Sequence, residues 1–221
     1  VVFAEESYKN HFPQLKNSIT VQNFPKINTD SITYKKIKLP IRKPKFVYLG
    51  TISYDRGAIK MQTALNSIFG PNNFELHFIG EIKDKKLEIE LNKIFSENKD
   101  IFYHGYRPMK EAWNICKDFH VGLAVLDKRN NYIDSYPTKI FEYLICGLPI
   151  ITSNFKLYRK LVEEKGVGFC VDPDNPTEIK NTLKKIIDDK HYTAMRKNIK
   201  NFPFYNFSWD NEFSNFLQFL K

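Results

Sequence analysis

The stretch from residue 134 to residue 153, DSYPTKIFEYLICGLPIITS, decides the fold, because it combines a loop, a short helix, a glycine stop and a buried strand. Tyr136 precedes Pro137, and a residue before proline is disfavoured in the helical region, so the loop extends to this point. Pro137 suits the first helical position, where its missing N–H costs no hydrogen bond. Gly147 follows the apolar helix positions as a stop, and the apolar run 148–151 then indicates a buried strand.

The first turn of this helix has the chemistry of a phosphate site. Unpaired N–H groups near Thr138 and Lys139 lie at the positive end of the helix dipole, and the Lys139 side chain would add charge. One turn later, Glu142 is an acceptor-only carboxylate that can bind two neighbouring hydroxyls, such as those of a ribose. The alternative is an ordinary surface pair between Glu142 and Lys139, and the spacing alone leaves both interpretations open.

The segment PTKIFEYLICGLPIITSN, residues 137–154, resembles the signature of the nucleotide-sugar-binding half of GT-B glycosyltransferases, especially the family 4 type. That family carries two acidic residues with seven residues between them. Glu142 takes the second position here, and Asp134, a shorter substitute for the usual Glu, takes the first. The resemblance implies that Glu142 holds the ribose and that Asp134 lies near the transferred sugar and the diphosphate. We therefore predict Asp134 and Glu142 as catalytic residues, with donor contacts from Ser135, Pro137, Thr138 and Lys139.

The loop GTISYDRG, residues 50–57, resembles the loop that follows the first strand of the family's donor domain. Gly50 would let a substrate approach the backbone closely. The family often has an Arg after this glycine and a Lys before the second glycine, and Thr51 and Arg56 occupy these places. We predict Arg56 as the phosphate clamp, because its fork can bind two oxygens at once. Lys60 is a weaker candidate, for which a solvated helix face is the more common interpretation.

The segment HGYRP, residues 104–108, resembles the loop that holds the base in this family. Tyr106 is predicted to stack on the base. Arg107 is either a second phosphate contact or a surface residue. His104 is expected to be structural, because a lone His at a strand end is weak evidence for a catalytic base.

Apolar runs and helical patterns alternate along most of the chain. This order predicts a parallel sheet with helices on both faces, an α/β Rossmann-like fold that matches the C-terminal half of a GT-B enzyme. In such a sheet, ligands bind outside the carboxyl ends of the strands. We expect strands at 46–50, 74–80, 101–104, 121–126, 150–153 and 168–171, and helices at 56–69, 85–95, 109–116, 157–164, 177–188 and 192–200.

The resemblance also implies a domain organisation. Residues 1–40 are expected to be a remnant of an N-terminal acceptor domain with its linker, which would make the chain a fragment. Residues 41–203 form the donor-binding domain, and residues 204–221 a helix that crosses back to the missing domain or mediates self-association. The alternative for residues 1–25 is one further unit of the same sheet.

Composition restricts the function only in part. Hydrophobic residues make up 42% of the 221 positions, enough for a packed core. The net charge of +9 is compatible with nucleic acid, an anionic membrane or phosphorylated small molecules. Because no zinc spacing, RNA-binding signature or recognition helix is found, we expect no nucleic-acid partner.

Cys116, Cys146 and Cys170 stand singly in apolar stretches, which indicates buried free thiols in a reducing compartment. No apolar run has the length of a membrane span, and no signal-peptide pattern opens the chain. We expect a cytoplasmic protein, with contact at the inner membrane surface left open.

The resemblance implies transfer of a sugar from a nucleotide-diphosphate sugar to an acceptor hydroxyl. The expected setting is the synthesis of a surface polysaccharide or glycolipid. The acceptor would be a glycan or a lipid-linked sugar, the base is unknown, and no metal or other cofactor is expected. Retention of configuration is implied by the family alone. A fragment without its acceptor domain should bind donor weakly and catalyse no transfer. The alternatives are a nucleotide-sugar epimerase of the same fold and a non-enzymatic module that binds nucleotides or nucleic acid.

Overall fold

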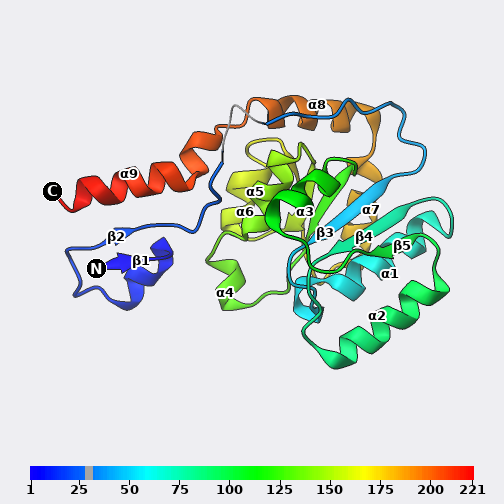
Figure 1. Ribbon diagram of the computed structural model, residues 1–221, viewed down its shortest axis with the longest axis horizontal. Coiled ribbons are helices and arrows are strands. Elements are labelled where there is room, and N and C mark those ends of the chain that lie inside the picture. The colour runs from blue at the N-terminus through cyan, green and yellow to red at the C-terminus, as the bar shows by residue number, and fades with distance from the viewer. Residues whose placement is uncertain (28–31) are drawn as a thin grey trace.

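The computed structural model describes residues 1–27 and 32–221, and within these residues the chain forms a large six-stranded sheet and a separate pair of short strands (Figure 1). Every strand of the large sheet is parallel to its neighbours. Its order is β5-β4-β3-β6-β7-β8, so the chain builds outward from β3 and then reverses direction at β6. This is the order of the doubly wound nucleotide-binding fold, and it creates a switch point between β3 and β6. The strands are β3 Lys45–Leu49, β4 Glu75–Ile79, β5 Ile101–Tyr103, β6 Val121–Ala124, β7 Ile150–Ser153 and β8 Gly168–Val171.

Helices cover both faces of this sheet because alternate strand residues point to opposite sides. Phe46 and Tyr48 pack in one buried cluster with α1, α2, α7 and α8, whereas Val47 and Leu49 pack in the other with α3, α5 and α6. The predicted α/β fold is therefore confirmed. The helices are α1 Ala58–Phe69, α2 Lys85–Glu97, α3 Met109–Cys116, α5 Thr138–Ile145, α6 Lys156–Val162, α7 Pro176–Ile186 and α8 Asp189–Lys200.

Two local features differ from the predicted elements. The helix expected from residue 56 begins at Ala58, because Gly57 has a φ of 77° and separates α1 from the 3-10 turn η3, Tyr54–Arg56. A short helix, α4 Asn130–Ile133, occupies the loop before α5 and has too few residues to give a periodic signal. Gly147, with a φ of 78°, ends α5 as predicted.

The N-terminal segment stands apart from the large sheet. Its strands β1 Val2–Phe3 and β2 Ile19–Thr20 pair with each other, with the 3-10 helix η1 Glu6–His11 between them. The alternative that residues 1–25 extend the large sheet is therefore wrong. The predicted linker includes residues 28–31, which lie outside the described ranges.

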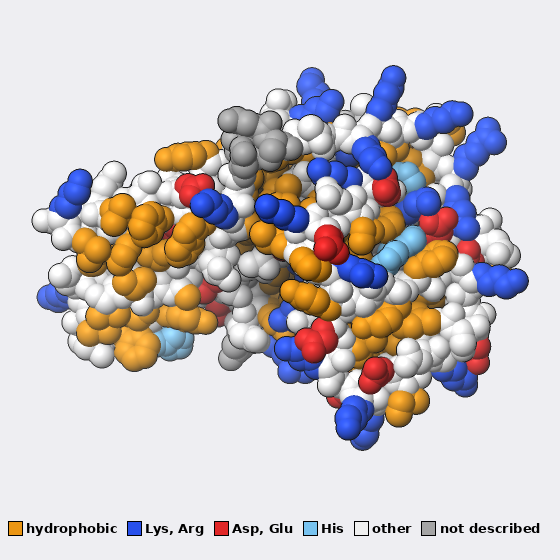
Figure 2. All heavy atoms as spheres, viewed as in Figure 1, with side chains coloured by type: hydrophobic (Ala, Val, Ile, Leu, Met, Phe, Trp, Pro, Cys, Tyr) orange, Lys and Arg blue, Asp and Glu red, His pale blue; other side chains and the backbone are white. Residues whose placement is uncertain are grey.

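The last helix, α9 Trp209–Phe219, follows the 3-10 turn η4 Phe204–Phe207 and extends from the core beside the N-terminal segment (Figure 1). The Gln22 N–H donates to the Glu212 carboxylate at 2.7 Å, and the Trp209 N–H donates to the Pro25 carbonyl at 3.1 Å. No residue of α9 is buried, and hydrophobic side chains gather over this arm of the molecule (Figure 2). Its exposed large side chains include Trp209, Phe213 and Leu217.

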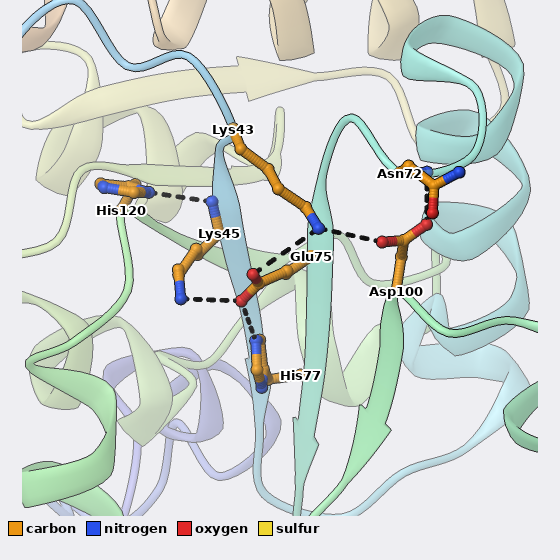
Figure 3. Close-up of polar contacts among 7 residues, drawn as sticks. All are labelled: Lys43, Lys45, Asn72, Glu75, His77, Asp100 and His120. Atoms are coloured by element: carbon orange, nitrogen blue, oxygen red, sulfur yellow. Dashed lines mark hydrogen bonds and ion pairs between the residues drawn. The ribbon is translucent and has the colours of Figure 1, made fainter.

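Charged side chains at the amino ends of β3, β4 and β5 neutralise one another (Figure 3). The Lys45 ammonium lies 2.8 Å from a Glu75 carboxylate oxygen, and Lys43 lies 3.1 Å from Asp100. A ring nitrogen of His77 lies 3.1 Å from the same Glu75 carboxylate. The charged side chains at the amino ends of these strands are therefore paired with one another.

All three cysteines are buried free thiols, as expected. Among the residues that the structure describes, no helix combines the length and apolar character of a membrane span.

Candidate functional site

A pocket opens at the carboxyl ends of β3 and β4, next to the switch point. Its volume is about 280 Å³, and it brings together Glu142 from α5, Gly50 and Thr51 from the loop after β3, and Tyr106 and Arg107 from the loop after β5. We call it the Glu142 pocket. Five residues predicted from separate parts of the sequence therefore line one cavity.

A second pocket, of about 380 Å³, lies at the start of α5, and we call it the Arg56 pocket. Further predicted donor contacts line it together with Glu5 and Tyr8 of the N-terminal segment, which supply one wall. Those predicted residues are Arg56, Ser135, Pro137, Thr138 and Lys139.

Glycines allow the loops at this edge to come close together. Gly50 has a φ of 93°, and a Cβ added there would lie 3.8 Å from Cε of Lys139. Gly80, with a φ of 153°, has no room for a side chain, because a Cβ would lie 1.9 Å from the Gly50 carbonyl oxygen. Gly50 lines the Glu142 pocket and Lys139 lines the Arg56 pocket, so the walls of the two cavities approach each other at these residues.

Tyr143 is a structural part of the site that sequence reasoning missed. Its hydroxyl accepts a hydrogen bond from the Leu49 N–H at 2.8 Å and donates to the Leu123 carbonyl at 3.0 Å. This phenol therefore bridges β3 and β6 just below the switch point. Its ring occupies the space above Gly122, where an added Cβ would lie 2.3 Å from a ring carbon.

Glu142 is half-buried and faces its pocket without an ion pair in the described part of the chain. Burial raises the pKa of its carboxyl group, and the charge of Lys139 opposes this effect only in part. The alternative of an exposed Glu142–Lys139 surface pair is wrong, since neither side chain is exposed and no ion pair joins them.

Lys139 is more deeply buried than its predicted role suggested. The sequence analysis predicted a side chain that adds positive charge at a phosphate site, but only 4% of the residue is exposed. Helical side chains point back toward the N-terminus, and here that direction leads under the loop after β3. Nζ lies 4.2 Å from the centroid of the Tyr48 ring and forms no hydrogen bond within the described residues. Burial, and next the charge of Arg56, lowers the pKa of Lys139 to about 7.

Arg56 is positioned by Tyr132, a contact that was not predicted from the sequence. Its Nε–H donates to the Tyr132 hydroxyl at 3.2 Å, and its guanidinium carbon lies 5.5 Å from the centroid of that ring. The same hydroxyl donates to Asp55 at 2.8 Å. Because Tyr132 is on α4, this contact ties the loop after β3 to the loop before α5.

Two other predicted residues lie less favourably for binding. Lys60 forms an ion pair with Asp127 at 2.6 Å, so the structural interpretation fits its position better. Asp134 is exposed and lines neither pocket, and its carbonyl accepts a hydrogen bond from the Ser7 hydroxyl at 3.3 Å.

A family model described as "Glycosyl transferases group 1" matches residues 31–202. The chain belongs to this family. A comparison with curated proteins gives no match.

Solved structures place this group 1 chain in the GT-B fold. The structure of Anabaena Alr3699/HepE in complex with UDP and glucose matches with a TM-score of 0.74 and 16% identity, over 100% of this chain and 62% of that one. A glycosyltransferase from Rickettsia africae ESF-5 matches with a TM-score of 0.77 and 14% identity, over 100% of this chain and 63% of that one. The chain thus spans less than two thirds of the length of these relatives.

A shorter relative matches over nearly its whole length. The C-terminal domain of LpcC, a glycosyl transferase group 1 family protein from Francisella tularensis, has a TM-score of 0.64 and 15% identity, over 79% of this chain and 95% of that domain. The predicted resemblance to group 1 glycosyltransferases is confirmed.

For this group 1 chain, the residues missed by sequence reasoning are those that organise the site. Asp55 was within the quoted loop, next to Arg56, but nothing in the sequence linked it to Tyr132. Tyr143 belongs to the apolar pattern of α5, where an aromatic residue indicates packing rather than a hydrogen bond between strands.

Proposed function

We propose that this chain is the donor-binding part of a glycosyltransferase. It binds a nucleotide-diphosphate sugar and supports transfer of the sugar to a hydroxyl of a glycan or lipid-linked acceptor. The observation that carries the proposal is Glu142, whose carboxylate faces an open pocket at the switch point without a charged partner among the described residues. A relative of the same fold, HepE, was solved with UDP-glucose, which supports a nucleotide sugar as the ligand.

In this proposal the Glu142 pocket holds the nucleoside. The Glu142 carboxylate accepts hydrogen bonds from the ribose hydroxyls. Tyr106 is 72% exposed and stacks on the base, while Gly50 and Gly80 let the ligand approach the backbone. Arg107 lines the same pocket and adds positive charge beside the ligand.

The diphosphate extends toward the Arg56 pocket. No side chain caps the start of α5, so the N–H groups near Thr138 are available to an anion at the positive end of the helix. Arg56 and Lys139 supply cations, and Ser135 and Pro137 form part of the wall. These groups stabilise the charge that grows on the leaving diphosphate. A place for Asp134 near the transferred sugar rests on the family resemblance alone, because this residue lines neither pocket.

The proposal also includes several features that the family resemblance implies. They are a metal-independent reaction, retention of configuration, and a place in the synthesis of a surface polysaccharide or glycolipid at the cytoplasmic side of a membrane. Another solved relative, WaaG, is a glycosyltransferase involved in lipopolysaccharide biosynthesis, which supports that setting.

The exposed apolar face of α9 is proposed as a contact with another folded unit. In the complete enzyme this unit would be an N-terminal acceptor domain, and in the isolated chain it would be a second copy. Light scattering over a range of protein concentrations tests the second case, and a Phe213→Asp variant should reduce any self-association.

Calorimetric titration with UDP, GDP and a short DNA duplex tests the donor proposal. We expect saturable binding of one nucleotide, weakened at least tenfold by Glu142→Ala, because hydrogen bonds to a charged group contribute about 1.5–3 kcal/mol. Glu164→Ala, at an exposed position after α6, is the matched control and should bind like the unchanged protein.

Two results would contradict the proposal. One is the absence of nucleotide binding, and the other is tight, salt-sensitive DNA binding without a response to nucleotides. Transfer activity of these 221 residues is a separate measurement, for which we predict no turnover.

A further inference from the structure

The Lys139 amine is enclosed by side chains that give it no hydrogen bond. The Tyr48 ring covers it from β3, with 4.2 Å between Nζ and the ring centroid. Gly50 lies near its Cε atom, since a Cβ added to this glycine would be 3.8 Å from Cε. Nζ itself is buried and forms no hydrogen bond within the described residues. Burying an ammonium without a hydrogen-bonded partner costs several kcal/mol, and the Tyr48 ring face offsets only part of that cost, so this environment favours the neutral amine.

The charged groups around Lys139 do not change this conclusion. Arg56, on η3, is a cation and opposes a second positive charge. Asp55 and Glu142 favour the ammonium but lie beyond ion-pair distance of Nζ, and Asp55 is already bound by Ser53 and Tyr132. Glu5, from the N-terminal segment, lines the same pocket but accepts a hydrogen bond from Gln22.

We propose that at pH 8 Lys139 is a neutral amine in the free protein and becomes an ammonium when a nucleoside diphosphate binds, so that donor binding takes up close to one proton from solvent. The proton adds to the Nζ lone pair, and the new ammonium offers N–H donors to the diphosphate oxygens. The diphosphate supplies the negative charge beside Nζ that no carboxylate of the described residues supplies at ion-pair distance. This inference rests on the proposed function and specifies how binding depends on pH.

The pH dependence has a definite sign. The pKa of Lys139 is lowered to about 7 in the free protein, and a diphosphate beside it raises the pKa in the complex. Between these two values binding consumes a proton, so affinity falls as the pH rises, by close to tenfold per pH unit. Departure of the nucleoside diphosphate returns the proton to solvent and is favoured by the same rise in pH.

Isothermal titration calorimetry at pH 8.0 measures the proton directly. UDP is titrated in buffers that differ in ionisation enthalpy, and the slope of the observed enthalpy against that quantity gives the number of protons exchanged. UDP is fully ionised at this pH, since a terminal phosphate has its second pKa near 6. We expect uptake of close to one proton per UDP, and no uptake with uridine if uridine binding is measurable. UDP binding that is independent of the buffer would overturn the inference.

Variants assign the proton to Lys139. Lys139→Met keeps the length of the side chain without a titratable group, and its UDP binding should be weaker and independent of the buffer. Lys160→Met, at an exposed position on α6, should retain the proton uptake. Persistent uptake in folded Lys139→Met would also overturn the inference. Failure of the unchanged protein to bind any nucleotide would instead reject the proposed function.

Discussion

The charged side chains at the amino end of the large sheet differ in their pairing from Glu142 and Lys139 at its carboxyl end. At the amino ends of β3, β4 and β5, Lys43, Lys45, Glu75 and Asp100 are joined by ion pairs (Figure 3). At the carboxyl ends, Glu142 and Lys139 form no ion pair within the described residues, although they stand one helical turn apart. The difference separates ion pairs that stabilise the fold from titratable groups that have no ion-pair partner within the described residues. Ion pairs between oppositely charged side chains maintain the fold, whereas an unpaired titratable group beside a cavity is a functional signal.

Acid should affect the amino half of the sheet most strongly. Burial lowers the pKa of His77 and of His120 to about 4 in the folded protein, compared with about 6.5 for an unfolded chain. The unfolded state therefore binds more protons, and stability is present in full above pH 6.5 and is lost as the pH falls toward 4. The loss amounts to as much as ~3 kcal/mol per histidine. Urea denaturation at pH 7 and pH 4.5 measures it, and a folded His77→Gln variant should show a flatter profile. Equal stability at both pH values would contradict the prediction.

Breaking an amino-edge pair should weaken the fold and leave ligand binding intact. Glu75→Ala removes the carboxylate that Lys45 and His77 share, and we expect a loss of about 2 kcal/mol in the free energy of unfolding. Glu97→Ala, at an exposed position on α2, is the control and should change stability by less than about 0.5 kcal/mol. The comparison fails if Glu75→Ala changes UDP affinity but not stability.

The same comparison predicts the opposite outcome at the carboxyl edge. Lys139→Met removes a buried amine that has no hydrogen bond, so the folded protein should become more stable by about 1 kcal/mol while UDP affinity decreases. Thermal unfolding and calorimetry of the same preparation measure both changes. A destabilised Lys139→Met protein would show that the amine contributes to the fold rather than to the ligand site.

The smallest expected effect concerns how Arg56 is positioned. Tyr132→Phe keeps the ring under the guanidinium but removes the hydroxyl that joins Arg56 to Asp55. We expect UDP affinity to decrease about fivefold, in line with one hydrogen bond of ~1 kcal/mol, and uridine affinity to stay unchanged. Tyr54→Phe is the control. Tyr54 lies on η3 with Arg56, and the substitution removes a hydroxyl that donates to the exposed Glu90. Equal losses for UDP and uridine would argue against a role at the phosphates.

The sequence predicted the sheet well because its signals are local. The strands at 150–153 and 168–171 have the predicted bounds, and Gly147 ends the helix between loop and strand. These elements follow from apolar runs and from a glycine with positive φ, which neighbouring residues determine.

The site was predicted only in outline because side-chain direction depends on tertiary packing. The residues predicted for the two pockets came from loops at strand ends and from the first turns of α5, which topology brings together. Burial of Lys139 depends on where β3 passes over α5, and the hold of Tyr132 on Arg56 depends on a four-residue helix without periodicity. No pattern in the sequence encodes either contact.

The Tyr143 phenol has an evolutionary consequence. Its ring needs the space over Gly122, and its hydroxyl replaces a direct link between two backbones. A mutation at either position alone would produce a clash or a void, so the two residues should be inherited as a pair. Descendants of this protein that alter the spacing of β3 and β6 beside the proposed nucleotide site would have to exchange both residues together.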